Sequence, residues 1–255
     1  MNKYIQKIKC AFQGKRTKES VYTGLYHTWN DAHQHSSKQQ GYADKHYDKR
    51  SLRKFTIGEK YTSGRNMIVP IVLAATHQES QTILDIGGGV NSIFSHLNTT
   101  QKNIHRCYVL ERPEIIDAFN AKIPQQYAEH LAYISNVDEL PCDNIDIVYF
   151  GSSVQYIPKY KELLLNLKHF NPKFIIFSES IFSKLESDVW VLQQNMKPNT
   201  FPNLFIAEKG FLDFMKSVGY DCTLNIIIPA EHSHDQIDRG QYECKTLIFK
   251  PCQKL

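Results

Sequence analysis

The stretch from Ile83 to Ser92 restricts the fold of this chain more than any other. An apolar run, Ile83-Leu84-Asp85-Ile86, leads into Gly87-Gly88-Gly89, and apolar residues then recur at helical spacing. Glycines let the backbone approach a ligand closely and adopt φ values that other residues resist, while the next helix offers unpaired N–H groups at its start. The pattern therefore predicts a strand, a tight turn and a helix, as found at nucleotide-type cofactor sites.

Strand and helix patterns alternate from Thr82 onward, which predicts an α/β fold with a mostly parallel sheet and helices on both faces. The expected strands are Thr82–Ile86, Arg106–Leu110, Leu131–Ser135, Ile145–Phe150 and Phe174–Ser178. Helices are expected from Pro113, from Tyr160 and from Phe211, the last ending at Gly219 in a left-handed cap. Two final strands, Thr223–Ile228 and Cys244–Phe249, suit an antiparallel pair at the sheet edge.

Length fits either one large domain or one domain with an appended lid, and size alone does not separate the two. The chain has 255 residues, of which 42% are hydrophobic. Residues 1–78 are expected to form a basic, aromatic and helical lid, with a helix from Arg65 to His77, over a domain formed by residues 79–255. The six cysteines form no Cys-x-x-Cys pair, so neither a zinc site nor a disulfide framework is indicated, and no metal is expected.

Charge is distributed unevenly along the chain. Residues 1–65 hold 14 Lys and Arg against 5 Asp and Glu, a net +9, whereas the remainder holds 16 against 21, a net −5. This basic segment suggests an anionic partner such as a phosphate or a lipid surface, although a solvated charged face is an equal alternative. Residues 2–12 have the pattern of a basic amphipathic helix that either rests on a membrane surface or packs on the protein. No nucleic-acid recognition motif accompanies the basic residues.

The apolar blocks of the sequence indicate a cytoplasmic protein. The longest block, Met67 to Ala75, is far shorter than the roughly 20 residues that a membrane-spanning helix needs. Lysines interrupt the stretch from Tyr4 to Phe12, so no signal peptide is expected. We therefore expect a cytoplasmic location, with peripheral contact to the inner membrane face through residues 2–12 as an addition.

Two acids beside the glycine turn indicate which cofactor fits. Asp85 precedes the turn, and Glu111 follows the second strand, 22 positions beyond Gly89, where an acid can accept hydrogen bonds from ribose hydroxyls. A nicotinamide dinucleotide site would need a third glycine where this chain has Ser92, and Asp85 would repel its pyrophosphate. The pattern favours the cationic, phosphate-free S-adenosyl-L-methionine, and an NAD-dependent oxidoreductase remains the alternative.

These motifs resemble two groups of proteins. Ile83-Leu84-Asp85-Ile86-Gly87-Gly88-Gly89 and Val109-Leu110-Glu111 are similar to motifs of class I S-adenosylmethionine-dependent methyltransferases. A more specific set resembles a methyltransferase family that accompanies surface-polysaccharide or lipopolysaccharide synthesis. That set comprises Trp29-x-Asp31-Ala32, Gly41-Tyr42, Glu111-Arg112-Pro113, Gly151-Ser152-Ser153-Val154-Gln155-Tyr156, and Gln193 before Phe201-Pro202. The resemblance implies a seven-stranded Rossmann-like sheet whose last strand is antiparallel.

The resemblance also assigns roles to individual residues. Asp85, Gly87, Gly88 and Gly89 would line the methionine end of the cofactor, and Glu111 would bind the ribose with Arg112 beside it. Asn136, Val137 and Asp138 would meet the adenine. Gly151 and Ser152 would lie near the transferred methyl group. Gln155 and Tyr156 would orient the acceptor, although both equally suit an ordinary connecting loop.

The base that removes the acceptor's proton is the least defined part. His232 and His234 lie on the loop between the last two expected strands and titrate near neutral pH, although a plain polar loop or a metal pair would explain them too. Glu179, just beyond the fifth strand, is the other candidate. Many methyl transfers depend mainly on alignment and need no strong base.

The sequence therefore predicts a methyltransferase that acts on a hydroxyl of a sugar, glycan or other small anionic intermediate, which is phosphorylated, nucleotide-linked or lipid-linked. Two alternatives are an oxidoreductase and a binding protein that has kept the fold but lost the transfer reaction.

Overall fold

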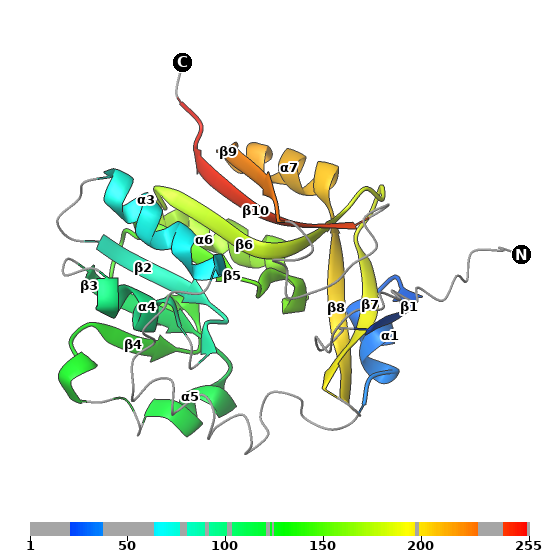
Figure 1. Ribbon diagram of the computed structural model, residues 1–255, viewed down its shortest axis with the longest axis horizontal. Coiled ribbons are helices and arrows are strands. Elements are labelled where there is room, and N and C mark those ends of the chain that lie inside the picture. Colours follow the sequence, from blue (N-terminus) through cyan, green and yellow to red (C-terminus); the bar gives the residue numbers. More distant parts are fainter. Residues whose placement is uncertain are drawn as a thin grey trace, which may run out of the picture.

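The computed structural model describes residues 21–37, 64–76, 81–89, 92–100, 104–120, 123, 125–196, 199–228 and 242–253 (Figure 1). Its central feature is a sheet with the strand order β4-β3-β2-β5-β6-β10-β9. The bounds are β2 Gln81–Ile86, β3 Ile104–Leu110, β4 Leu131–Ile134, β5 Ile147–Gly151, β6 Phe174–Ser183, β9 Tyr220–Ile227 and β10 Tyr242–Pro251. Neighbours from β4 to β6 are parallel, whereas β10 is antiparallel to both β6 and β9. The predicted α/β fold with a mostly parallel sheet and an antiparallel last strand is confirmed.

Two apolar layers cover the two faces of this sheet. Successive strand residues point to opposite faces, so Ile83 packs in one buried cluster and Leu84 in the other. The first layer contains α3 (Ile68–Thr76), α4 (Ile93–Thr100) and α5 (Pro113–Asn120), and the second contains α6 (Tyr160–Leu167) and α7 (Glu208–Ser217). The helix predicted to stop at Gly219 does so, because this glycine has φ +95° directly after the α7 cap.

A second group of strands was not predicted. The strands β7 (Val189–Met196) and β8 (Asn199–Ala207) form an antiparallel hairpin, and β1 (Val21–Tyr26) adds to β7 antiparallel. In Figure 1 this hairpin stands at one end of the molecule with β1 and α1 (Trp29–Gln34) against it. The strand β6, expected to end at Ser178, continues to Ser183 and pairs in parallel with β8. It thereby joins the hairpin to the main sheet.

The N-terminal segment is only partly helical. Residues 1–78 were expected to form a helical lid, and the described part contains α1, the 3₁₀ turn η1 (Gly64–Met67) and α3. The expectation is wrong for Val21–Tyr26, which form β1, because their backbone groups find partners on β7, more than 160 residues away. The predicted helix from Arg65 to His77 corresponds to η1 and α3, and α3 packs on the main sheet through Val69 and Leu73.

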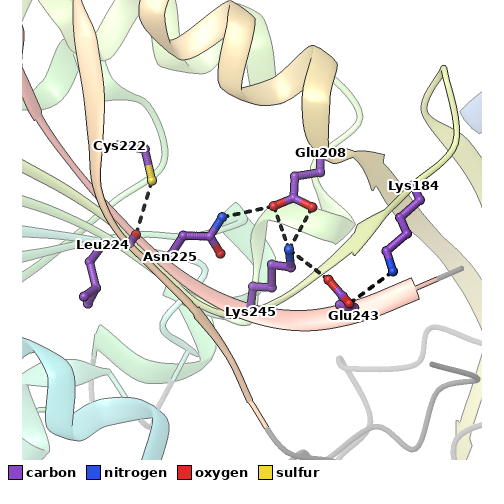
Figure 2. A network of polar contacts seen from close by, with 7 residues as sticks. All are labelled: Lys184, Glu208, Cys222, Leu224, Asn225, Glu243 and Lys245. Carbon is purple, nitrogen blue, oxygen red and sulfur yellow. Dashed lines mark hydrogen bonds and ion pairs between the residues drawn. The ribbon is translucent and has the colours of Figure 1, made fainter. Parts of the chain in front are cut away.

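An ion-pair network fastens the start of α7 to the last two strands. Lys245 on β10 donates to both oxygens of Glu208, at 2.6 and 2.8 Å, and lies 2.9 Å from Glu243 Oε2 (Figure 2). Asn225 on β9 donates to Glu208 at 3.1 Å, and the exposed Lys184 lies 3.4 Å from Glu243. Burial opposes the charge of Lys245, but the hydrogen bonds to Glu208 and Glu243 outweigh it and raise the pKa of the ammonium group. The hydrogen bond and charge of Lys245, together with those of Lys184, lower the pKa of the Glu243 carboxyl group.

None of the helices that the structure describes is long and apolar enough to cross a membrane. Residues 2–12 lie outside the described residues.

Candidate active site

The candidate site lies at the carboxyl edge of the parallel strands, between β2 and β5. Here β3 and β4 extend the sheet to one side of β2, and β5 and β6 extend it to the other. The loops that leave β2 and β5 therefore diverge, and open α/β sheets bind their ligands at such a point. The residues that follow β2, β3, β4, β5 and β6 decide what this edge can bind.

The glycine turn after β2 needs glycine for space as well as for conformation. Gly87 and Gly89 have φ +69° and +56°, values that side-chain-bearing residues rarely adopt. A Cβ on Gly88 would overlap the carboxylate of Asp85, and a Cβ on Gly87 would lie 2.9 Å from Cβ of Ser153. The turn is therefore packed between Asp85 on one side and the loop after β5 on the other.

Asp85 is buried behind the turn, with an exposed fraction of 1%. Its Oδ2 accepts a hydrogen bond from the backbone N–H of Ile93, at 2.7 Å, in the first turn of α4. The carboxylate thus ties the start of α4 to the end of β2 and sits favourably at the positive end of the helix dipole. Asp85 therefore shapes the turn, and its predicted place at the methionine end of a cofactor stays a prediction.

Glu111 follows β3 and stands beside the glycine turn. Its Oε1 lies 3.8 Å from the position that a Cβ of Gly89 would occupy, and its Oε2 accepts from the backbone N–H of Arg112 at 3.0 Å. Burial raises the pKa of this carboxyl group, and the N–H of Arg112 partly offsets the effect. Arg112 itself is exposed and lies 3.4 Å from Glu114. The Glu111 carboxylate therefore lies beside Gly89 of the turn, whereas the Arg112 side chain pairs with Glu114.

Tyr133 is a residue of this region that the sequence analysis missed. Its hydroxyl donates to the carbonyl oxygen of Gly89 at 2.9 Å, so β4 holds the glycine turn through this hydrogen bond. Burial, together with the nearby charge of Asp85, raises the pKa of this phenol strongly, which keeps it a neutral donor. Its position near the end of a short apolar strand was the signal that the sequence offered.

The residues after β4 are mostly occupied by their own turn. Asn136 caps the 3₁₀ turn η4 (Val137–Glu139) by accepting from the N–H of Asp138 at 3.2 Å, and Glu139 completes the capping box. Val137 is buried in the core cluster under the sheet. Asn136, Val137 and Asp138 were predicted to meet adenine; the structure places them directly after β4, with Asn136 and Asp138 exposed and Val137 packed inward.

The loop after β5 brings the other predicted residues to the glycine turn. Gly151 packs against Tyr149, because an added Cβ would lie 2.8 Å from that ring. Ser152 has φ +60° and accepts from Gln155 Nε2 at 3.0 Å, and Gln155 is fully buried. Ser153 lies against Gly87. The segment after β5 thus touches the turn after β2 through Ser153, and Gly151, Ser152 and Gln155 flank this contact in sequence; the roles predicted for these three residues stay predictions.

Tyr156 connects this loop to the second group of strands. Its hydroxyl donates to Gln193 Oε1 at 2.7 Å, and Asn203 Nδ2 donates to the same oxygen at 2.9 Å. Gln193 Nε2 in turn donates to the Tyr22 hydroxyl at 3.0 Å. These four residues, which we call the amide network, join β1, β7 and β8 to the turn η5 (Val154–Tyr156). Gln193 was named only through the resemblance. Tyr22 could not be found from a local pattern because its partner is 171 positions away, and Asn203 was missed because the β7–β8 hairpin was not predicted.

Of the three candidate bases, the structure describes Glu179. Glu179 lies inside β6 with φ +49° and an exposed fraction of 7%. It follows Ser178, whose carbonyl oxygen accepts from the N–H of Ser152 at 2.8 Å, so Glu179 is adjacent to the loop after β5. His232 and His234 lie outside the described residues.

The residues of this edge fit a cationic adenosyl cofactor. The turn offers backbone at close approach, Glu111 offers a hydrogen-bond acceptor for hydroxyls, and the buried Ser153 Oγ beside Gly87 has no hydrogen-bond partner among the described residues. Arg112, the basic side chain that follows Glu111, pairs with Glu114. A pyrophosphate would instead meet carboxylates at both ends of the turn.

Comparisons with known proteins place the fold. No family model matches the sequence, and no curated protein matches it. Among solved structures, the chain is similar to the 1,6-didemethyltoxoflavin N1-methyltransferase of Burkholderia thailandensis, with TM-score 0.52, 12% identity, and coverage of 81% of this chain and 87% of that one. It is also similar to an S-adenosylmethionine-dependent methyltransferase of Clostridium acetobutylicum, with TM-score 0.51, 10% identity, and coverage of 82% and 100%.

A third similar structure is the amino pentose methyltransferase of Micromonospora echinaspora involved in calicheamicin biosynthesis. Its TM-score is 0.50 at 10% identity, with coverage of 77% of this chain and 94% of that one. The fold of this chain is that of the class I methyltransferases.

Proposed function

We propose that this protein is an S-adenosyl-L-methionine-dependent methyltransferase. The observation that carries the proposal is the antiparallel β10 between β6 and β9, combined with acids on both sides of the glycine turn. Dinucleotide-binding sheets instead have the order 3-2-1-4-5-6 and a third glycine that packs the helix on the strand. Here that position is Ser92, which is fully buried.

The residues of the chain divide the work of binding. Gly87, Gly88 and Gly89 would let the cofactor lie against the backbone, and Glu111 would accept hydrogen bonds from the ribose hydroxyls. Asp85 would act through the turn, because it holds the start of α4 in place. The bound cofactor supplies an electrophilic methyl group, and alignment of the acceptor with that methyl provides most of the rate enhancement.

The acceptor that we propose is a hydroxyl of a sugar, a glycan or another small biosynthetic intermediate. The resemblance to methyltransferases that accompany surface-polysaccharide synthesis supports this class, and one similar structure is named as an amino pentose methyltransferase. The basic residues 1–65 favour an acceptor that carries a phosphate, a nucleotide or a lipid elsewhere in the molecule. The N-terminal segment up to residue 78 would act as the lid of the site, because Tyr22 already contacts Gln193.

Titration of the purified protein with S-adenosylhomocysteine and, separately, with NAD tests the reaction class. We expect binding of S-adenosylhomocysteine alone, and Glu111→Ala should weaken it roughly tenfold or more because a charged acceptor of hydrogen bonds is lost. Asp85→Ala should weaken it as well, through the displaced turn. Glu162→Ala is the matched control, since this carboxylate on α6 is exposed and pairs with the also exposed Lys159 directly before the helix.

Binding of NAD, or unchanged affinity in both site variants, would contradict the proposal and favour the oxidoreductase. A protein that binds S-adenosylhomocysteine but transfers no methyl group to any acceptor would be the binding protein without activity.

Deletion of residues 1–20 tests the role of the basic segment. We expect weaker binding to vesicles that contain anionic lipid, or weaker methylation of phosphorylated acceptors relative to neutral ones. Vesicles of neutral lipid are the control. If the deletion changes neither quantity, the anionic-partner proposal is wrong, although the methyltransferase proposal is unaffected.

A further inference from the structure

Two residues at the candidate site have a backbone conformation that disfavours their side chains. Ser152 after β5 and Glu179 in β6 have φ +60° and +49°, and neither is a glycine. The third described case, Asn171, ends a 3₁₀ turn, where the left-handed conformation is ordinary. Strained residues persist only where the surroundings hold them in place, and they gather at functional sites.

A β-bulge holds Glu179 in this conformation. On β10, Lys245 pairs with Ser180 and Leu247 pairs with Phe177, so the single residue Thr246 faces both Ser178 and Glu179. The extra residue lies where β6 leaves its pairing with β5 and continues toward β8. Bulges of this kind re-aim a side chain at the rim of a sheet, and here the residue that they re-aim is an acid.

Glu179 and Gln155 are linked to one hydrogen bond between the two strand ends. The N–H of Ser152 donates to the carbonyl oxygen of Ser178 at 2.8 Å, directly before Glu179. The hydroxyl of Ser152 accepts from Gln155 Nε2 at 3.0 Å. One hydrogen bond therefore joins the segment that carries Gln155 to the part of β6 that carries Glu179, and Ser153 in the first of these segments lies against Gly87 of the glycine turn.

The side-chain oxygen of Gln155 is a buried hydrogen-bond acceptor next to Ser152. Gln155 is fully buried, and its Oε1 has no hydrogen-bond partner within the described part of the chain. A buried amide oxygen without a donor costs free energy, so it points to a ligand that supplies a donor. An amide oxygen and a carboxylate both accept hydrogen bonds, so the group that suits them is a hydroxyl or an ammonium group.

Resting on the proposed function, we propose that Glu179 and Gln155 form the acceptor side of the methyl-transfer site. Gln155 Oε1 orients the group to be methylated, and Glu179 is the general base. As the oxygen of an acceptor hydroxyl forms its bond to the methyl carbon, the carbon–sulfur bond breaks and its electron pair stays on sulfur. The hydroxyl proton passes to the Glu179 carboxylate and then to water. The reacting group itself is a hydrogen-bond donor, whatever charge the rest of the acceptor carries.

The cofactor analogue sinefungin tests this assignment without knowledge of the acceptor. Sinefungin carries an amino group where the cofactor carries its methyl group, whereas S-adenosylhomocysteine carries nothing there. The wild-type protein should bind sinefungin more tightly than S-adenosylhomocysteine by calorimetry. Glu179→Gln should reduce this preference roughly ten- to hundredfold and Gln155→Leu about tenfold, with the affinity for S-adenosylhomocysteine changed little. Glu162→Gln, on the exposed face of α6, should leave both affinities unchanged.

The outcomes separate the two proposals. If S-adenosylhomocysteine binds but the wild type shows no preference for sinefungin, or both site variants keep the preference, the acceptor-side assignment is overturned and the proposed cofactor stands. If neither analogue binds the wild-type protein, the proposed function itself fails. Loss of affinity for both analogues in correctly folded Glu179→Gln would show a role in cofactor binding instead, and would also overturn the assignment.

Discussion

The glycine turn shows how single residues adapt this edge of the sheet to a ligand. Gly88 has no room for a side chain because its missing Cβ faces the Asp85 carboxylate, which in turn holds the first N–H of α4. One methyl group at this position would therefore push the Asp85 carboxylate aside and disturb the contacts between β2, the turn and α4. Gly210, in the first turn of α7, has no atom within 4 Å of its missing Cβ.

Gly88→Ala and Gly210→Ala should accordingly have opposite effects. Gly88→Ala should lower the free energy of unfolding by about 1–3 kcal/mol through overpacking and weaken binding of S-adenosylhomocysteine. Gly210→Ala should raise the free energy of unfolding by about 0.5–1 kcal/mol and leave binding unchanged, because alanine favours an exposed helix. Urea unfolding and calorimetric titration measure both quantities. Equal effects of the two substitutions would contradict the steric account of the turn.

Glu111 illustrates a conflict between stability and function at one residue. Burial raises the pKa of its carboxyl group above the ordinary value of 4.5 in the folded state. The folded protein thus holds this proton more tightly than the unfolded chain does. The contribution of Glu111 to stability is fully present below pH 4.5 and decreases as pH rises toward the folded-state pKa.

Glu111→Gln should therefore stabilise the protein at neutral pH while it weakens cofactor binding. The difference in unfolding free energy between the variant and the wild type should be small near pH 4.5 and should grow between that pH and neutrality. Urea unfolding at a series of pH values measures this difference, with Glu114→Gln as the exposed control. A difference independent of pH would mean that desolvation of Glu111 is not the cause.

Among the elements, the start of α7 depends on charges from the last two strands. Lys245 has a side chain only 7% exposed and neutralises two carboxylates, Glu208 on α7 and Glu243 on β10. Its removal would leave two acids close together without the cation between them. By contrast, Lys209 on the same helix is 88% exposed and pairs with Asp213 in solvent.

Lys245→Ala should lower the free energy of unfolding by roughly 2–4 kcal/mol, since two partly buried carboxylates lose the cation between them and keep only the exposed Lys184 and the neutral amide of Asn225. Lys209→Ala should have almost no effect, because an exposed pair is screened by water and salt. Thermal unfolding at low and high salt would compare the two variants. A similar small loss in both would show that the buried network contributes no more than a surface pair.

At the scale of the whole molecule, the amide network unites segments that lie far apart in sequence. Tyr22 and Gln193 belong to β1 and β7, whereas Tyr156 follows the main-sheet strand β5. Without β1, the edge of β7 would lose its backbone partners and Gln193 would lose its contact with Tyr22. An open strand edge also promotes association between chains.

Two truncations isolate the contribution of β1. A protein that lacks residues 1–28 should melt at a lower temperature and associate more readily than one that lacks residues 1–20, because only the longer deletion removes β1. Calorimetry and light scattering measure these two properties. Equal melting temperatures and equal masses in solution would show that β1 is dispensable for the β7–β8 hairpin.

The sequence by itself determined the main sheet and the place of the glycine turn. Strands such as Gln81–Ile86 are continuous apolar runs because both faces are covered, and helices such as Tyr160–Leu167 repeat their apolar residues with the helical period. These signals are local, so they survive without knowledge of the rest of the chain. Asp85, the glycines and Glu111 were placed correctly at one edge because parallel strands all end on the same side of a sheet.

Only the tertiary structure decided the partners across the site. Strand β1 pairs with β7, and the hydrogen bond between Tyr22 and Gln193 across this pair joins residues 171 positions apart. The hydrogen bond from Tyr156 to Gln193 spans 37 positions, and the one from Tyr133 to Gly89 spans 44. The left-handed backbone of Glu179 likewise depends on a bulge against β10, which no property of Glu179 itself predicts. Hydrogen bonds between distant segments carry no periodic signal along the chain, so the sequence could name Gln155 and Glu179 as candidates, but only the tertiary structure shows that the loop before Gln155 is hydrogen-bonded to β6 directly before Glu179.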